Sequence, residues 1–129
     1  MRNLILAGAL ALLAGQAVAN DVYGVWATQK SDEGKFLHVE VHACKANPAQ
    51  VCGTIVEALG GADTSVVGKP IIWDMEPDGQ NAWSDGKIWK ADDDEVYDSE
   101  MALKGNVLQV SGCILFGTVC RAQDWPRVQ

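Results

Sequence analysis

Hydrophobic and polar residues alternate with a period of two along most of the chain after residue 20. No window shows the stripe of an amphipathic helix, and turn-forming residues recur about every 8 to 12 residues. The pattern predicts an all-β domain with about eight strands, at residues 22–28, 36–43, 51–58, 70–74, 87–90, 96–103, 107–115 and 118–125. Turns are predicted at Gly60-Gly61, Pro77-Asp78-Gly79, Asp85-Gly86 and Gly105-Asn106.

Short turns between consecutive strands favour an up-and-down arrangement, in which each strand pairs with the next one along the chain. Closing such a sheet into a barrel covers the edges that an open sheet leaves unpaired. We therefore expect one small antiparallel up-and-down β-barrel over residues 20–129, with no second domain and with a monomer as the working form.

The strand at residues 36–43 has the clearest alternation. One face carries Leu37, Val39, Val41 and Ala43, and the other carries His38, Glu40 and His42. Imidazole and carboxylate groups are ligands for zinc, copper or nickel. Three consecutive same-face side chains on a strand seldom converge on one point, so we interpret this as a solvated polar face and predict no metal site or cofactor. Metal binding stays as the weaker alternative.

The N-terminus has the layout of a cleaved secretory signal. Arg2 precedes an apolar run at residues 4–14, which is shorter than the roughly 20 residues of a membrane-spanning helix. Ala17-Val18-Ala19 is a small-x-small cleavage pattern, so residues 1–19 are predicted to be removed after Ala19. Gln16 stands where lipid attachment would need a cysteine. The expected location is the periplasm or the exterior, without a lipid anchor.

The chain has four cysteines, an even number in a small chain with a predicted signal, and this indicates two disulfides. Three pairings are possible. Local pairing is geometrically easiest, because Cys113 and Cys120 flank a four-residue loop and Cys44 and Cys52 flank a turn. A structural zinc site is disfavoured because no pair of cysteines is separated by only two residues.

The formal net charge of −7 limits the partners that this chain can bind. An acidic surface repels the phosphates of nucleic acid and the headgroups of anionic lipids. We therefore predict no nucleic-acid partner and no binding that relies on anionic lipid headgroups. No membrane span is expected after signal removal, because the short apolar run at residues 4–14 belongs to the signal.

Gly24-x-Trp26 in the first strand and Trp125-Pro126-Arg127 near the C-terminus resemble the corresponding motifs of the calycin and lipocalin barrels. In those barrels the tryptophan packs at the closed end and a late arginine stacks across it. The resemblance implies that Gly24, Trp26 and Arg127 close this barrel, with the guanidinium over the indole ring.

A longer pattern resembles the bacterial secreted family catalogued as domain of unknown function 2147. It comprises Gly24-x-Trp26, Val51-Cys52-Gly53-x-Ile55-Val56, Gly86-Lys87-Ile88-Trp89, Tyr97 with Met101 to Leu103, Leu108-x-Val110-x-Gly112 and Trp125-x-Arg127-Val128. The resemblance covers the whole predicted domain and implies a small, exported, lipocalin-like barrel. Residues 91–95 depart from the family's usual turn, and no catalytic residue is carried over.

Five tryptophans make the chain rich in large rigid aromatics. Trp73, Trp83, Trp89 and Tyr97 are the candidates for lining a ligand site. We predict binding of a small apolar or amphipathic ligand at the open end of the barrel. The alternative is an envelope protein-interaction module, such as an inhibitor or assembly factor, in which exposed tryptophans anchor the interface.

We expect no enzymatic activity, because the chain has neither a nucleophile motif nor a metalloprotease or phosphate-binding motif. The four carboxylates of residues 92–95 lack the spacing of a calcium loop. They are predicted to form a solvated turn.

Overall fold

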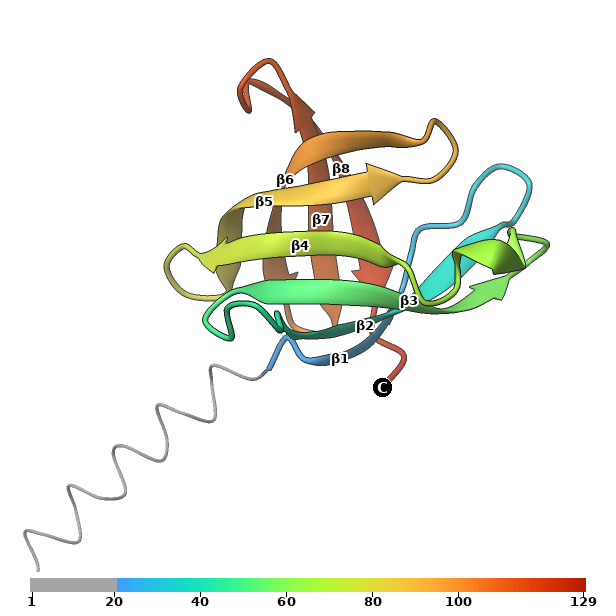
Figure 1. Cartoon of the computed structure of the whole chain (residues 1–129), viewed down its shortest axis with the longest axis horizontal. Helices are drawn as coiled ribbons and strands as arrows, with labels where there is room; N and C mark the ends of the chain where they lie inside the picture. The colour runs from blue at the N-terminus through green and yellow to red at the C-terminus, as the bar shows by residue number, and fades with distance from the viewer. Residues whose placement is uncertain (1–20) are drawn as a thin grey trace, which may run out of the picture.

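The computed structural model describes residues 21–129, so the predicted signal at residues 1–19 lies outside the described residues. Within 21–129, eight antiparallel strands form one sheet, and each strand pairs with the next along the chain (Figure 1). The strands are β1 (Gly24–Ala27), β2 (Phe36–Ala43), β3 (Val51–Leu59), β4 (Pro70–Pro77), β5 (Ala82–Lys90), β6 (Glu95–Lys104), β7 (Val107–Ile114) and β8 (Val119–Pro126). The predicted all-β, up-and-down fold is confirmed.

The period-two pattern separates an inner from an outer face of the curled sheet. On β2, Val39 and Val41 are buried whereas Glu40 is exposed, as predicted. Directly paired residues share a face, so Val39 meets Ile55 of β3 inside the sheet. Burial of each such side chain contributes about 1.5–3 kcal/mol. The buried core comprises Val22, Trp26, Val39, Val41, Val51, Ile55, Val66, Ile71, Ile72, Met75, Met101, Leu108, Val110 and Trp125.

The predicted turn at Asp85-Gly86 is wrong, because both residues lie inside β5. Asp85 has a φ of 59°, and the β5–β6 register shifts between Trp83 and Gly86, so the turn-forming residues make a bulge. A Cβ atom on Gly86 would lie 2.4 Å from the Met75 sulfur. Glycine is therefore required here for packing, and the bulge bends the strand without ending it.

Several predicted strand limits were also too short or too long. The strand predicted at 70–74 continues to Pro77, although Asp74 has a φ of 59°. The one predicted at 87–90 begins at Ala82, and the first strand is limited to Gly24–Ala27. Aspartate is a turn-forming residue in a sequence because it tolerates a positive φ. Here Asp74 and Asp85 have a positive φ within strands, where they mark irregular points.

The connections agree better with the predictions. Residues 78–81 turn between β4 and β5, and Gly105-Asn106 is a two-residue turn between β6 and β7. Before β4 lies the short 3₁₀ helix η1 (Thr64–Val66), and Asp63 caps its N-terminal end. The Ser65 backbone N–H donates to this carboxylate over 2.9 Å and lowers the pKa of Asp63.

Both disulfides have the local pairing that the spacing favoured. Cys44 is bonded to Cys52 next to the β2–β3 turn, and Cys113 is bonded to Cys120 across β7 and β8. Each bridge closes a short loop, which in the chain-entropy model contributes about 2–3 kcal/mol. Two disulfides are consistent with an extracytoplasmic protein. Within residues 21–129, no helix is long and apolar enough to cross a membrane.

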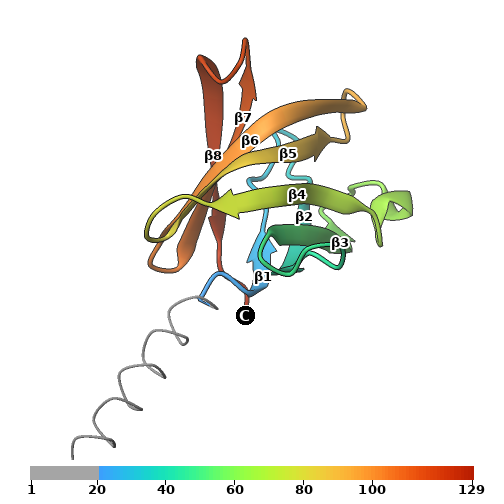
Figure 2. The same cartoon turned by 60° about the vertical axis from the view of Figure 1, so that its left-hand side comes forward.

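The C-terminus closes one end of the barrel against β1, as Figure 2 shows. Trp26 pairs with Arg127, and the Val128 N–H donates to the Val25 carbonyl over 2.7 Å. The Arg127 guanidinium lies 4.2 Å from the centre of the Trp26 ring, which confirms the predicted stacking. A Cβ atom on Gly24 would lie 2.5 Å from the Gln129 carbonyl oxygen, so this glycine admits the C-terminal tail.

The other end of the β7–β8 pair projects beyond the rest of the sheet (Figures 1 and 2). Every residue from 114 to 124 is exposed, and Phe116 at the loop is fully exposed. We call residues 113–122 the projecting hairpin. Its cross-strand disulfide holds together two strands that have little core beneath them.

Candidate functional site

The aromatic residues predicted to line a ligand site do not form one cluster. Trp73 lies opposite Lys87 on the outer face, whereas Trp83 lies opposite the buried Met101 and packs against the core. The sequence placed them near two turns, but one of those turns is the β5 bulge. Strand pairing therefore places Trp73 and Trp83 on different faces of the sheet.

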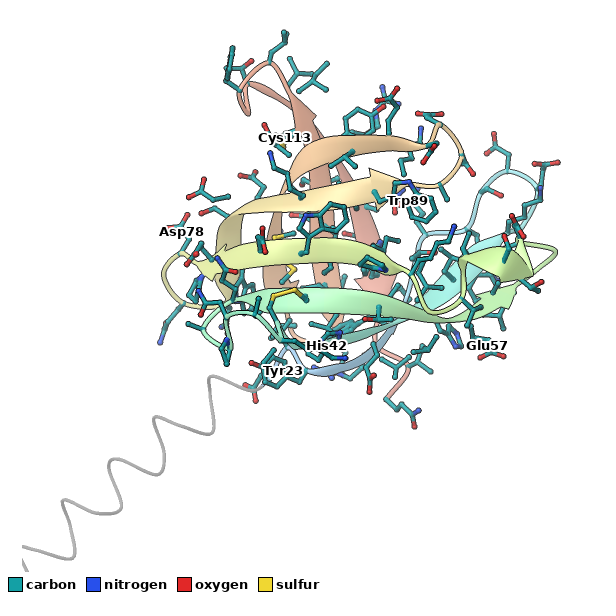
Figure 3. The ribbon with its side chains drawn as sticks, viewed as in Figure 1. Tyr23, His42, Glu57, Asp78, Trp89 and Cys113 are labelled. Carbon is teal, nitrogen blue, oxygen red and sulfur yellow. A yellow bond between two sulfur atoms is a disulfide. The ribbon has the colours of Figure 1, made fainter. Side chains whose placement is uncertain are left out.

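Trp89 and Tyr97 instead support the acidic turn between β5 and β6. The Trp89 indole N–H donates to Asp94 over 2.9 Å, and the Tyr97 hydroxyl donates to Asp93 over 3.3 Å. Lys90 pairs with Asp93 at 3.2 Å. Figure 3 shows Trp89 at this end of β5 and Asp78 beyond its other end. Two of the four carboxylates of the exposed turn, those of Asp93 and Asp94, therefore have structural partners.

The two histidines of β2 also have separate partners. His38 Nδ1 lies 3.2 Å from a Glu57 carboxylate oxygen. His42 Nε2 lies 2.8 Å from the Thr54 hydroxyl, and its Nδ1 lies 2.8 Å from the Ala43 carbonyl oxygen. The outer face of β2 is thus a polar surface with local hydrogen bonds. These contacts do not direct His38, Glu40 and His42 toward a common point.

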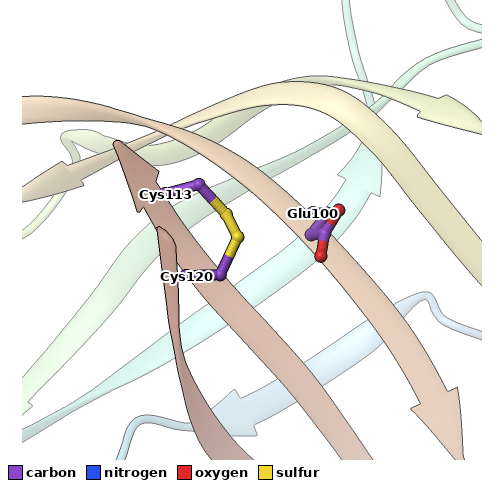
Figure 4. Close-up of side chains that lie close together, drawn as sticks. All are labelled: Glu100, Cys113 and Cys120. Atoms are coloured by element: carbon purple, nitrogen blue, oxygen red, sulfur yellow. A yellow bond between two sulfur atoms is a disulfide. The ribbon is translucent and has the colours of Figure 1, made fainter. Parts of the chain in front are cut away.

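One group of metal-ligand atoms does converge among residues 21–129. The Glu100 carboxylate and the sulfurs of Cys113 and Cys120 lie within 4.8 Å of one another (Figure 4). Both sulfurs belong to a disulfide, so neither provides the thiolate that metal binding requires. The group places a carboxylate beside the base of the projecting hairpin and is not a metal site in this oxidised state.

The outer face of β5, β6 and β7 carries two adjoining depressions, with volumes of about 410 and 230 Å³. They share Ser84 and Glu100 in their linings, and we call the two adjoining depressions the outer groove. Phe116 of the projecting hairpin borders the larger depression, and Trp83 borders the smaller one. The groove therefore has an aromatic residue in the lining of each part.

The lining of the outer groove is predominantly acidic. Asp85, Asp98 and Glu100 line the larger part together with a single cation, Lys87. Lys87 is already paired with Asp98. Within residues 21–129, Asp85 and Glu100 are in no ion pair. The larger part of the groove thus offers two unpaired carboxylates near an exposed phenyl ring, an arrangement suited to a positively charged group with an apolar part.

The closed end of the barrel contrasts with this groove because side chains fill it. Trp26 and Trp125 are both buried, and Met75 lies with them in the same core cluster. The Trp26 indole N–H donates to the Val22 carbonyl over 2.9 Å, so the polar atom of this ring is satisfied. These residues have a packing role.

Sequence reasoning missed the groove residues Asp85, Lys87, Asp98 and Glu100. Two signals for them were present. Outward alternation along residues 95–104 placed Asp98 and Glu100 on one face, and an exposed aromatic in a disulfide-flanked loop pointed to Phe116. What joins these residues is the pairing of β5, β6 and β7, which no local pattern specifies.

The strand order, the closure by Trp26 and Arg127, and the curled sheet define a lipocalin-like β fold. The structure is similar to one described as "Protein HP1028 from the human pathogen Helicobacter pylori belongs to the lipocalin family". The TM-score is 0.68 at 15% sequence identity, and the similarity covers 84% of each chain. At this identity the similarity establishes the fold alone.

Residues 24–127 match the family described as "Uncharacterized protein conserved in bacteria (DUF2147)". The chain belongs to this family, which confirms the resemblance seen in the sequence. A comparison with curated proteins gave no match.

Proposed function

We propose that this protein is a non-enzymatic binding protein that takes a small amphipathic, positively charged ligand in the outer groove. The observation that supports this most is the 410 Å³ depression beside Phe116, because its volume falls within the range of small-molecule sites. Its unpaired carboxylates favour a cation, and the phenyl ring favours an adjacent apolar group. The proposal keeps the ligand class expected from the sequence, but of the four predicted aromatic residues only Trp83 lines the groove.

The headgroup preference is tested by calorimetric titration with octylamine, octanol and octanoate, which share one alkyl chain. Octylamine should bind best and octanoate worst, because only the ammonium group gains from Asp85 and Glu100. Equal affinity for the three probes, or no binding of octylamine, would contradict the proposal.

Two variants then locate the site. Glu100→Gln should weaken octylamine binding about two- to fivefold, the range of an exposed ion pair, and leave octanol binding unchanged. Phe116→Ser should weaken both probes. Glu33→Gln is the matched control, because it removes one exposed carboxylate that pairs only with Lys35, at 3.6 Å. A loss in the control as large as that in Glu100→Gln would show a non-specific charge effect.

Protein docking is a second candidate function, and the apolar loop of the projecting hairpin favours it. Leu115 is 64% exposed and Phe116 is 102% exposed. A photo-reactive phenylalanine analogue at position 116 should give a discrete cross-linked product in the native envelope. The same group at Val67, which is also exposed, should give none. Equal labelling from both positions would count against docking through the hairpin.

The expected place of action is outside the cytoplasm, after removal of residues 1–19. The disulfides Cys44–Cys52 and Cys113–Cys120 support an oxidising compartment. N-terminal sequencing of the protein from its own envelope fraction should begin at Asn20, and a chain that retains residues 1–19 would contradict the cleavage prediction.

A further inference from the structure

The barrel is closed along only part of β8. β8 has eight residues and β1 has four, and their contact consists of the Trp26–Arg127 bridge and the adjoining tail. Residues 119–124 are all exposed. Within the described chain, this part of β8 is therefore a free strand edge.

The hydrogen-bond pattern shows which backbone groups face that edge. The Arg127 N–H donates to the Asn106 carbonyl over 2.9 Å, toward β7, whereas the Val128 N–H donates to Val25, toward β1. Successive residues of a strand point their N–H and C=O groups to opposite sides. The even-numbered residues Cys120, Ala122 and Asp124 thus present theirs to the free edge.

Two further observations agree with this assignment. The Cys113 and Cys120 Cα atoms are 4.1 Å apart, the short spacing of a pair that exchanges no hydrogen bonds with its neighbour. Pro126 is also even-numbered, so the N–H that it lacks is not needed by β7. The ladder between β7 and β8 is therefore complete without the edge-facing groups.

Residues 119–124 have few of the features that usually protect a free edge. They contain no lysine and no proline, the β7–β8 register has no bulge, and their two charged side chains, Arg121 and Asp124, have opposite signs. The charge pattern is also permissive. In a chain of net charge −7, residues 119–124 carry one carboxylate, Asp124, and one cation, Arg121, so this edge has no net charge that opposes the approach of a second copy.

Exposed apolar side chains gather at the same place. Of the eight large hydrophobic residues that are exposed among residues 21–129, four lie on the projecting hairpin. These are Ile114, Leu115, Phe116 and Val119. Such a concentration is typical of an interaction surface.

We propose that a second copy of this chain occupies the free edge, with the two β8 strands antiparallel about a two-fold axis beside Ala122. The edge-facing residues are symmetric about Ala122, so Cys120 pairs with Asp124 of the second copy and all three residues find hydrogen-bonding partners. The small Ala122 side chain allows close approach. In this register Arg121 lies opposite Gln123 of the second copy and avoids its own counterpart.

Sedimentation equilibrium of the purified, disulfide-bonded protein tests the proposal, and no ligand is needed. The wild-type protein should have twice the chain mass at micromolar concentration. Ala122→Pro removes one edge-facing N–H, and Ala122→Lys places two ammonium groups against each other. Both variants should weaken dimerisation at least about tenfold. Ala122→Ser keeps the N–H and the small size, so it should remain dimeric.

Amide hydrogen exchange supplies a second test. It uses the wild-type protein, so it does not require any variant to fold. In the dimer, exchange should be slow at Cys120, Ala122 and Asp124 as well as at Arg121 and Gln123. On dilution to the monomer, only the edge-facing amides should become fast. A wild-type monomer at every concentration, or a dimer without this alternation, would overturn the proposal. In the first case the edge would be left for the strand of another protein.

Discussion

The closed end of the barrel and the projecting hairpin are both built from β8, yet they differ in what holds them. At the closed end Trp125 is buried and Arg127 stacks on Trp26. In the projecting hairpin, the same strand is exposed on both faces from residue 119 to residue 124. Packing accounts for the first region. The second is ordered by one turn, one ladder and one disulfide.

The two ends of one strand therefore differ in how much packing holds them. At the closed end, Gly24 makes room for the C-terminal tail. Trp26 and Arg127 each donate a hydrogen bond to a backbone carbonyl. Loss of core contacts at the other end leaves a phenyl ring, an acidic groove and an unpaired edge. A region that contributes little to folding yet exposes apolar groups is a reasonable place for a partner.

The largest expected effect is that of Trp26→Ala at the closed end. Removing this buried indole should lower the free energy of unfolding by about 3–5 kcal/mol, because the cavity adds to the lost burial. Urea unfolding followed by circular dichroism measures the change. A loss below about 1 kcal/mol would mean that the closed end does not hold the barrel together.

Removing each disulfide in turn tests whether the projecting hairpin contributes less to stability than the rest of the barrel. Cys44→Ser with Cys52→Ser should lower the stability by about 2–3 kcal/mol. The loop closed by Cys113 and Cys120 is of similar length, but Cys113→Ser with Cys120→Ser should lower the stability less. Without its bridge the projecting hairpin gains motion in the folded state also, which offsets part of the entropy gained on unfolding. Equal losses in the two double variants would contradict this view of the hairpin.

Arg127→Lys tests the stacking at the closed end with the charge kept. The lysine loses the planar contact with Trp26 and the hydrogen bond to the Tyr23 carbonyl, which is 3.2 Å long. We expect a loss of about 1–2 kcal/mol. Arg121→Lys on the exposed hairpin is the matched control and should change stability by less than about 0.5 kcal/mol. Thermal unfolding measures both stabilities. Equal losses of stability in Arg127→Lys and Arg121→Lys would contradict a stabilising role for the stacking on Trp26.

The smallest effect is expected from Phe116→Ser. The ring is fully exposed, so its removal should change the free energy of unfolding by less than about 0.5 kcal/mol. Octylamine binding should nevertheless weaken. A clear loss of stability in urea unfolding would show that Phe116 supports the fold and would weaken its role as a binding residue.

The sequence by itself determined the up-and-down strand order and the inner and outer faces of β2, and it favoured the local disulfides. These depend on short-range rules: alternation, turn residues, and the few residues between paired cysteines. The likeness of Gly24-x-Trp26 and Trp125-x-Arg127 to a known family added the contact between the two ends of the chain. Period-two patterns are informative because a slip of one residue would turn every apolar side chain outward.

Only the tertiary structure decided the rest. The Asp85-Gly86 pair is a turn by local chemistry, but packing against Met75 and pairing with β6 make it a bulge. The aromatics were predicted to gather because they are close in sequence, yet strand pairing placed Trp73 and Trp83 on different faces. The outer groove and the free edge of β8 depend on which strands lie side by side and on how far β1 extends. Those are long-range properties, so no window of the sequence contains them.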